Sequence, residues 1–203
     1  MIIISITDAD AVEKTVAMLR GGGIILAPTD TVYGIGCEYR YREALKKIAV
    51  LKGRSEDKPT ALLCSSIAMA ASVVTITPKM RASLAEVWPG PFTAVLSRVD
   101  GGGNEGVRVP NQAFIRAVID ACGEPLWMTS ANRAGEPAQT HGAAVQRDFE
   151  SIAGDDVLMV DGGDLPDSMA STVVNFTTMP PTILRAGPVS RERLEEIFKT
   201  TFQ

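Results

Sequence analysis

Five basic side chains stand where secondary-structure elements are expected to end, and they are the residues of this chain best suited to bind an anion. Lys52, Arg54 and Lys58 come at or after the end of a predicted helix. Arg108 lies in a short predicted strand, and Arg185 closes another. A cation at a helix C-terminus explains Lys52 by itself, but it explains Arg54 and Lys58 less well. Because ligand sites in α/β sheets form at element ends, the five predict a polyanion-binding cleft, with a nucleotide or other phosphate ester favoured.

Small hydrogen-bonding side chains occupy similar positions. Residues 28–34 follow an apolar strand with the polar turn Thr-Asp-Thr, and Thr129-Ser130-Ala131-Asn132 ends a later strand. Thr93 follows the rigid turn at residues 88–91, and Ser171-Thr172 opens another strand. Each segment alone is ordinary turn chemistry. Together with the five cations, they predict a site built from hydroxyls and positive charges.

Several familiar signatures do not fit. Residues 101–106 match G-x-G-x-x-G, but they precede a predicted strand instead of opening a helix, so a flexible loop is favoured. The sequence has no P-loop and no G-x-S-x-G. His141, the only histidine, lies in a polar loop and is predicted to be an exposed loop or cap residue. A Ser-His-Asp hydrolase would depend on it. Asp161, Asp164 and Asp167 lack EF-hand spacing, so a solvated turn is favoured.

Composition sets the class of protein. The 203 residues, 45% of them hydrophobic, are enough for one packed domain. The net charge of −4 argues against a surface that coats nucleic acid. Three separated cysteines and one histidine do not form a zinc set, so buried cytosolic thiols are expected. Without a signal peptide or an apolar run of about 18 residues, we expect a soluble, cytoplasmic protein and no membrane partner.

Periodicity and breakers predict a single α/β domain around a twisted mixed sheet, with about seven strands and five or six helices. Some neighbouring strands lack an intervening helix, so a purely parallel sheet is not expected. A capping box of Asp10 and Glu13 starts the first helix, which Gly21 stops. Other helices are predicted at 42–51, from Thr77 to before Trp88, at 114–122, at 142–153 and after Ser190. Strands are predicted at 24–27, 60–64, 93–97, 106–109, 126–129, 157–160, 171–175 and 182–184.

Seven blocks, in this order, resemble the YrdC/Sua5 family, the threonylcarbamoyl-AMP synthases. The blocks are residues 28–34, Lys52-x-Arg54 with Lys58-Pro59, residues 88–93, Arg108-Val109-Pro110, Ser130-Ala131-Asn132, residues 171–174, and Leu184-Arg185-x-Gly187. The resemblance runs from about residue 8 to 200. It implies an open twisted sheet flanked by helices, with a deep, positively charged cleft. It also implies one YrdC-like domain over residues 1–203, without the additional C-terminal domain of long members.

The resemblance further implies an activity. Family members form threonylcarbamoyl-AMP and pyrophosphate from L-threonine, bicarbonate and ATP. The product feeds the tRNA threonylcarbamoyl transferase machinery that makes t6A in tRNA. Mg²⁺ is expected with ATP, held by its phosphates and not by a protein metal site. Weak contact of tRNA or double-stranded RNA with the cleft is a further expectation.

By the same resemblance, residues matching the family's motifs take the family's roles. Lys52 and Arg54 would be catalytic and would neutralise phosphate charge. The ATP-binding set would be Lys52, Arg54, Lys58, Thr93, Ser130, Asn132 and Arg185. The threonine-binding set would be Thr31, Arg108 and Ser171, with Arg108 pairing with the substrate carboxylate.

Two other interpretations stay open at this point. One is a paralogue that uses another nucleotide or carbamate, because two segments depart from the family pattern. Ala138 replaces a hydroxyl residue, and Leu62-Leu63-Cys64 is apolar where a polar residue is common. The other is an RNA-binding module without this activity, for which salt-dependent RNA binding without ATP turnover would be the signature.

Overall fold

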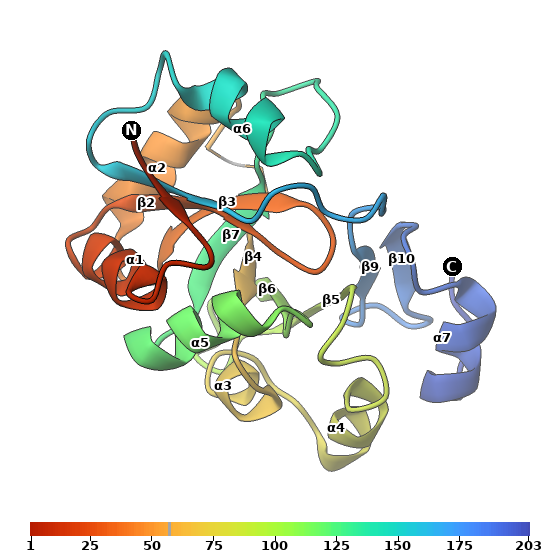
Figure 1. Cartoon of the computed structure of the whole chain (residues 1–203). Coiled ribbons are helices and arrows are strands. Elements are labelled where there is room, and N and C mark those ends of the chain that lie inside the picture. Colours follow the sequence, from red (N-terminus) through yellow and green to blue (C-terminus); the bar gives the residue numbers. More distant parts are fainter. Residues whose placement is uncertain (57) are drawn as a thin grey trace.

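Ten strands form one mixed sheet in the computed structural model, which describes residues 1–56 and 58–203 (Figure 1). The order across the sheet is β1-β8-β2-β3-β7-β4-β6-β5-β9-β10. Five neighbouring pairs are antiparallel and four are parallel, so the prediction of a mixed sheet is confirmed. The strands are β1 (Ile2–Ser5), β2 (Ile24–Pro28), β3 (Tyr33–Glu38), β4 (Ala61–Leu63), β5 (Phe92–Ser97), β6 (Asn104–Arg108), β7 (Leu126–Ser130), β8 (Val157–Asp161), β9 (Thr172–Asn175) and β10 (Thr182–Arg185).

Seven helices connect and cover these strands in the described part of the chain. They are α1 (Ala11–Arg20), α2 (Arg42–Lys52), α3 (Ile67–Ala71), α4 (Pro78–Leu84), α5 (Ala113–Cys122), α6 (Gly142–Phe149) and α7 (Arg191–Phe198). None of these helices has the length and apolar character needed to span a lipid bilayer.

Helix caps and breakers show where local sequence decided the structure. Thr77 Oγ1 accepts from the backbone amide of Met80 at 3.2 Å, and Ser190 caps α7 in the same way, as predicted. Asp10 stands at the N-cap position of α1 as predicted, but the capping box is wrong: its side chain makes no capping hydrogen bond and its carboxylate pairs with Lys14 at 2.9 Å. His141 is confirmed as an exposed cap-position residue at the start of α6.

The sequence pattern did not predict two strands, β1 and β3, or the short helix α3. In β3, glycines at positions 34 and 36 interrupt the pattern of apolar side chains. Gly36 is required there, since a Cβ would lie 2.3 Å from the carbonyl oxygen of Trp127 on β7. The predicted loop at 101–106 is also shorter than expected, because β6 already begins at Asn104.

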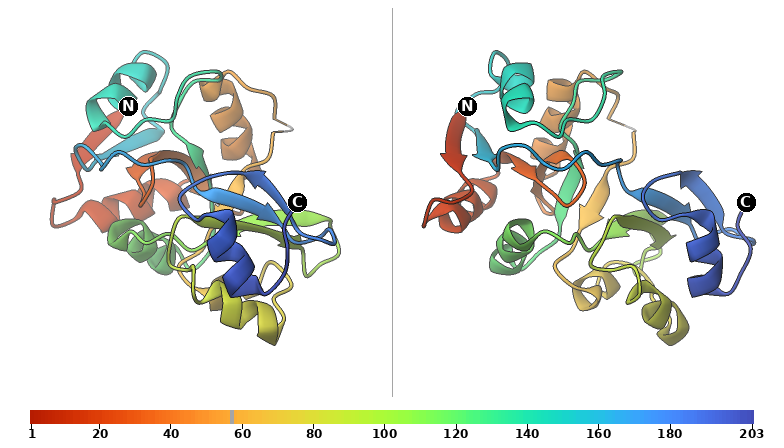
Figure 2. Two further views of the ribbon diagram at one scale, coloured as in Figure 1. Left: turned by 90° about the vertical axis from the view of Figure 1, so that its right-hand side faces the viewer. Right: turned by 45° about the vertical axis from the view of Figure 1, so that its right-hand side comes forward.

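Alternate strand residues feed two hydrophobic cores, one on each face of the sheet. Ile24 and Leu26 of β2 belong to the first core, whereas Ile25 and Ala27 belong to the second. Helices α2, α4, α6 and α7 bury apolar residues in the first core, and α1 and α5 in the second (Figure 2). Burying each large aliphatic side chain contributes about 1.5–3 kcal/mol.

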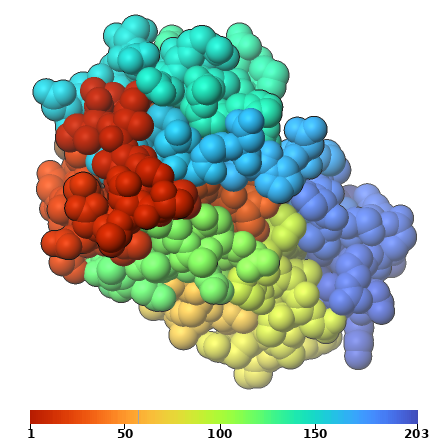
Figure 3. Space-filling view, in the orientation of Figure 1, coloured from red at the N-terminus to blue at the C-terminus, as the bar shows by residue number. Residues whose placement is uncertain are grey.

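The second face changes character along the sheet. Over β1, β8, β2, β3 and β7 it packs on α1 and α5. Farther along, Ala61 of β4, Arg108 of β6, and Thr93 and Val95 of β5 point from the same face into a cavity. Figure 3 shows the segments around residues 30, 90 and 170, red-orange, yellow-green and blue, meeting on one side of the molecule.

Strand β10, which carries Arg185 at the end of the sheet, is paired on its outer side as well. The backbone amide of Ile183 donates to the carbonyl of Gln203 at 2.7 Å, and the amide of Gln203 donates to the carbonyl of Pro181 at 2.9 Å. The Phe202 side chain is buried in an aromatic cluster with α7. These contacts fix the strand that presents Arg185.

Candidate functional site

The cavity on the second face has a volume of about 520 Å³ and gathers side chains from distant parts of the chain. The turn between β2 and β3, the ends of β5, β6, β7 and β10, and the segment before β9 all contribute. Six of the ten residues predicted for the site line it: Thr31, Thr93, Arg108, Ser130, Ser171 and Arg185.

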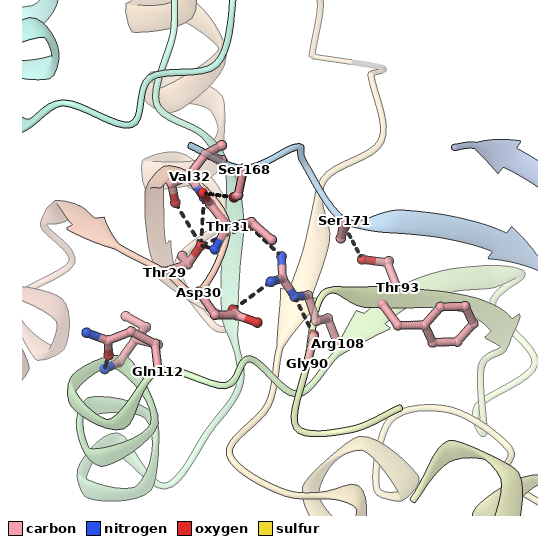
Figure 4. A network of polar contacts seen from close by, with 12 residues as sticks. Thr29, Asp30, Thr31, Val32, Gly90, Thr93, Arg108, Gln112, Ser168 and Ser171 are labelled. Atoms are coloured by element: carbon pink, nitrogen blue, oxygen red, sulfur yellow. Dashed lines mark hydrogen bonds and ion pairs between the residues drawn. The ribbon is translucent and has the colours of Figure 1, made fainter. Parts of the chain in front are cut away.

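Each of the three guanidinium nitrogens of Arg108 donates a hydrogen bond to the protein. Its Nε donates to the carbonyl of Gly90 at 3.0 Å, its Nη1 to Thr31 Oγ1 at 3.1 Å, and its Nη2 to Asp30 Oδ1 at 2.6 Å (Figure 4). Burial lowers the pKa of Arg108, and the Asp30 carboxylate acts against that effect. Three of its five N–H groups are therefore used by the protein, which leaves two for a ligand.

The turn that supplies Asp30 and Thr31 is itself fixed. Thr29 Oγ1 donates to the carbonyl of Val32 at 2.7 Å and accepts from the amide of Thr31 at 3.1 Å. From the segment after β8, Ser168 Oγ donates to the carbonyl of Thr31 at 2.6 Å (Figure 4). The polar turn singled out in the sequence is therefore a preorganised wall of the cavity.

Ser171 connects Thr93 with Arg185, the second arginine of the cavity. Its hydroxyl is 2.8 Å from Thr93 Oγ1, and Arg185 Nη2 donates to it at 3.0 Å. Arg185 Nε also donates to the Ser171 carbonyl at 3.0 Å. The pKa of Arg185 is lowered by burial and, to a smaller extent, by the charge of Arg108. The close approach needs Gly187, because a Cβ there would lie 2.4 Å from the backbone nitrogen of Thr172.

Lys52, at the end of α2, is buried against carbonyl groups. Its Nζ donates to the carbonyls of Ser130 and Asn132 and to Asn132 Oδ1. Asn132 also accepts from Ser130 Oγ, and its amide nitrogen donates to the carbonyl of Glu136 at 2.7 Å. Burial, with a smaller effect of the Arg54 charge, lowers the pKa of Lys52 to about 8.

Arg54 and Lys58 differ in how they stand relative to the cavity. Arg54 Nη2 donates to Thr60 Oγ1, a cavity-lining residue. Its Nε is buried without a hydrogen-bond partner among the described residues, and burial lowers its pKa. Lys58 is exposed in the loop before β4 and does not line the cavity. The structure thus connects Lys52, Arg54 and Asn132 to the cavity wall, but not Lys58.

Sequence reasoning missed Asp30, Thr60 and the carbonyl of Gly90. Asp30 lies in the polar turn Thr29-Asp30-Thr31, but its partner Arg108 is 78 residues away in the sequence. Of the two departures from the family pattern, the apolar stretch 62–64 is explained by the sheet: Leu62 and Cys64 face the first core, and Leu63 reaches the cavity. Ala138 is half-buried in the loop after Asn132.

The fold and the cavity define an α/β domain with an open mixed sheet and a cation-lined site at its strand ends. The Sua5/YciO/YrdC family model, described as "Telomere recombination", matches residues 17–187. The chain therefore belongs to the Sua5/YciO/YrdC family.

Individual relatives agree with this assignment. The threonylcarbamoyl-AMP synthase of Bacillus subtilis (strain 168) is 30% identical over 202 residues, which cover 94% of this chain and 57% of that protein. A relative from Mycobacterium leprae (strain TN) is 31% identical over 198 residues, covering 93% of this chain and 88% of the relative. The chain thus spans little more than half of the Bacillus protein.

A solved structure supports the fold over the whole chain. P. abyssi Sua5 complexed with L-threonine superposes with a TM-score of 0.89 at 28% sequence identity. The match covers 100% of this chain and 63% of that one. The fold expected from the sequence, an open α/β sheet flanked by helices, is confirmed.

Proposed function

We propose that this chain is an L-threonylcarbamoyladenylate synthase, a nucleotidyltransferase that forms threonylcarbamoyl-AMP and pyrophosphate from L-threonine, bicarbonate and ATP. The observation that carries the proposal is one cavity lined by an acid-paired arginine, Arg108, and by Arg185, which has no described acid partner, with Lys52 bound to the cavity wall through the Ser130 carbonyl. The names of the relatives support the same activity over the RNA-binding alternative and over another carbamate substrate.

The reaction proceeds in two bond-forming steps. The threonine ammonium first loses one proton, and the resulting amine attacks the bicarbonate carbon to form a C–N bond. Hydroxide leaves with a proton from the nitrogen as water, which gives a carbamate. A carbamate oxygen then attacks the α-phosphorus of ATP, and the bond from that phosphorus to the bridging oxygen of pyrophosphate breaks. Such a transfer needs positioning and charge neutralisation and no covalent enzyme nucleophile.

Threonine occupies the Arg108 end of the cavity. Its carboxylate takes the two N–H groups of Arg108 that the protein leaves free, in a charge-assisted pair. Thr31 and Ser171, whose hydroxyls stand beside the two arginines, hold the rest of the amino acid. The support from comparison is the P. abyssi Sua5 structure, whose title names L-threonine as its ligand.

ATP occupies the other end. Lys52 and Arg54 neutralise the phosphates and the attacking carbamate, and Arg185 holds the nucleotide. Ser130, Asn132 and Thr93 add hydrogen bonds, and Lys58 reaches the nucleotide from the exposed loop. Lys52 has to exchange at least one of its carbonyl partners for a phosphate oxygen, because three oxygens surround its Nζ.

Magnesium accompanies ATP in this proposal. Among the described residues, no group of three or more His, Cys, Asp or Glu side chains is arranged to hold a metal ion. Phosphate oxygens and water are the ligands that Mg²⁺ commonly keeps when it arrives with a nucleotide. The ion would lower the charge of the phosphates, and the side chains named above do the positioning.

The product is a mixed anhydride, so an acyl-acceptor reaction must consume it. We assign that role to the tRNA threonylcarbamoyl transferase machinery that makes t6A, and we place the protein in the cytoplasm with its substrates.

Incubation with ATP, Mg²⁺, L-threonine and labelled bicarbonate tests the activity. We expect pyrophosphate release that requires both threonine and bicarbonate, with label in an AMP adduct. ATP binding without such release would point to a paralogue with another carbamate substrate. Salt-dependent tRNA binding without any ATP turnover would point to the RNA-binding module.

A further inference from the structure

We propose that Asp30 makes the Arg108 end of the cavity selective for a zwitterionic amino acid and closes it to phosphate. Asp30 would do so by cancelling the charge of Arg108, which leaves the positive charge of the cavity at its nucleotide end. The inference rests on the proposed function, because it takes Arg108 as the carboxylate-binding residue.

The first support is the fixed geometry of the pair. Asp30 Oδ1 is 2.6 Å from Arg108 Nη2, and the two side chains are only 10% and 7% exposed. Figure 4 shows the carboxylate and the guanidinium pointing toward each other. Ser168 and Thr29 hold the turn that carries Asp30, so the carboxylate cannot easily swing away. A buried pair of this kind is screened little by salt.

The second support is the other arginine that lines the cavity, Arg185. Arg185 donates to the backbone carbonyl and to the hydroxyl of Ser171. Among residues 1–56 and 58–203, Arg185 has no carboxylate partner. Without Asp30, the cavity would hold two guanidinium groups without a carboxylate partner, Arg108 and Arg185, and Arg185 contacts the hydroxyl pair of Ser171 and Thr93. Arginine forks with hydroxyl donors are a favourable setting for phosphate.

Charge then decides which ligand enters. A zwitterionic amino acid has no net charge and matches the neutral Asp30–Arg108 pair. A phosphate dianion would place two negative charges close to the Asp30 carboxylate in a poorly hydrated site, where like charges repel strongly. Both substrates share one cavity, so such a device keeps the phosphates of ATP from occupying the amino-acid end.

Asp30 acts through Arg108 and is a positioning residue, since its side chain does not line the cavity. Replacing Asp30 should therefore change how tightly phosphate competes with threonine. A general loss of stability would not produce that change.

Asp30→Asn is the test, because the amide keeps an oxygen that can accept from Arg108 while the charge is removed. Threonine binding and pyrophosphate release are measured at saturating ATP, with inorganic phosphate as the competing probe. We expect phosphate to compete with threonine at least tenfold more tightly in Asp30→Asn than in the natural protein. Asp30→Glu, which restores the charge, should return phosphate competition toward the natural level.

Glu38→Gln is a matched control. Glu38 is also buried, its Oε1 accepts from an arginine, Arg40, at 3.0 Å, and its second oxygen has no partner among the described residues, as for Asp30. It stands at the opposite end of β3 from the cavity. We expect Glu38→Gln to lower the thermal midpoint without any change in phosphate competition.

The natural protein provides a second test in case Asp30→Asn does not fold. The phosphonate analogue of threonine, which carries an additional negative charge, should bind at least tenfold more weakly than threonine. Equal binding of phosphonate and carboxylate, or unchanged phosphate competition in folded Asp30→Asn, overturns the inference and leaves the synthase activity standing. A natural protein that neither binds threonine nor releases pyrophosphate overturns the proposed function instead.

Discussion

Arg108 and Arg185 line the same cavity, yet their surroundings differ. Arg108 makes one hydrogen bond from each nitrogen and pairs with Asp30. Arg185 makes its bonds to uncharged oxygens of Ser171, and Lys52 likewise contacts only amide and carbonyl oxygens. The charge of Arg108 is thus balanced by Asp30, whereas Arg185 and Lys52 keep a positive charge without a described acid partner.

The difference between the paired Arg108 and the unpaired Arg185 and Lys52 suggests how an acidic protein can bind a polyanion. Burial without an acid partner lowers the pKa of Lys52 and of Arg185, which is a cost to folding. Under the proposed function, that cost is offset by phosphate oxygens, because desolvated charges attract strongly. The paired end instead gains orientation, which suits recognition of one small zwitterion.

Arg54→Ala should have the largest effect and tests the unbalanced end. We expect a loss of about 2–5 kcal/mol in transition-state stabilisation, roughly 30- to 5,000-fold in kcat/KM for ATP. Arg54→Lys should fail as well, because a point charge does not reproduce the planar fork. Pyrophosphate release is the measurement, and exposed Arg81→Ala on α4 is the control. Near-normal turnover in Arg54→Ala would remove Arg54 from the mechanism.

Gly187→Ala tests whether binding of threonine and binding of ATP both depend on the close approach of Gly187 to the backbone of residues 170–172. The new Cβ would lie 2.4 Å from the nitrogen of Thr172 and 2.6 Å from the carbonyl oxygen of Ala170, so the segment around Ser171 must move. We expect a destabilisation of roughly 1–3 kcal/mol and weaker binding of both substrates. Urea unfolding measures it. Gly21→Ala, whose Cβ finds ordinary 3.4 Å contacts, should be close to neutral.

The pH dependence of ATP affinity should separate the two ends, because the pKa of Lys52 is lowered to about 8 while Arg108 stays charged. Above pH 8 Lys52 loses its charge, so ATP affinity should fall by up to about tenfold per pH unit. Titrations without threonine measure this. Arg54→Gln should move the fall to higher pH, since the Arg54 charge contributes to the lowered pKa. A flat profile between pH 7 and 10 would contradict the assignment of Lys52.

The same pKa has a consequence for folding. The unfolded chain, with the Lys52 pKa at 10.5, binds more protons than the folded chain between about pH 8 and that value. The contribution of Lys52 to stability therefore rises with pH across this window.

Ser171→Ala should have the smallest effect, because it removes only the hydroxyl that Thr93 and Arg185 contact. Thr93 Oγ1 and Arg185 Nη2 each lose a partner, which is worth about 0.5–1.5 kcal/mol, or roughly two- to tenfold in threonine KM. Steady-state kinetics measures it. Ser72→Ala, at the exposed residue that follows α3, should leave KM unchanged. An equal loss in both variants would mean that the hydroxyl has no role in binding.

Local sequence determined many of the elements and much of the candidate site. Thr77, followed by Pro78, and Ser190 each cap the helix that begins at the next residue. The apolar runs of β2, β5 and β8 predict strands from their own pattern. The strand β3 could not be predicted in this way. Its glycines are there because β7 lies close, and that neighbour comes from the other half of the chain.

The sequence by itself determined which residues could do chemistry, because cations and hydroxyls at element ends have few other uses in an acidic protein. It did not decide which of them would be paired. Only the tertiary structure brought Asp30 to Arg108, left Arg185 beside Ser171, and kept Lys58 out of the cavity wall. The reason is physical: an ion pair depends on distance and burial, and for residues 78 apart both are set by the order of strands in the sheet.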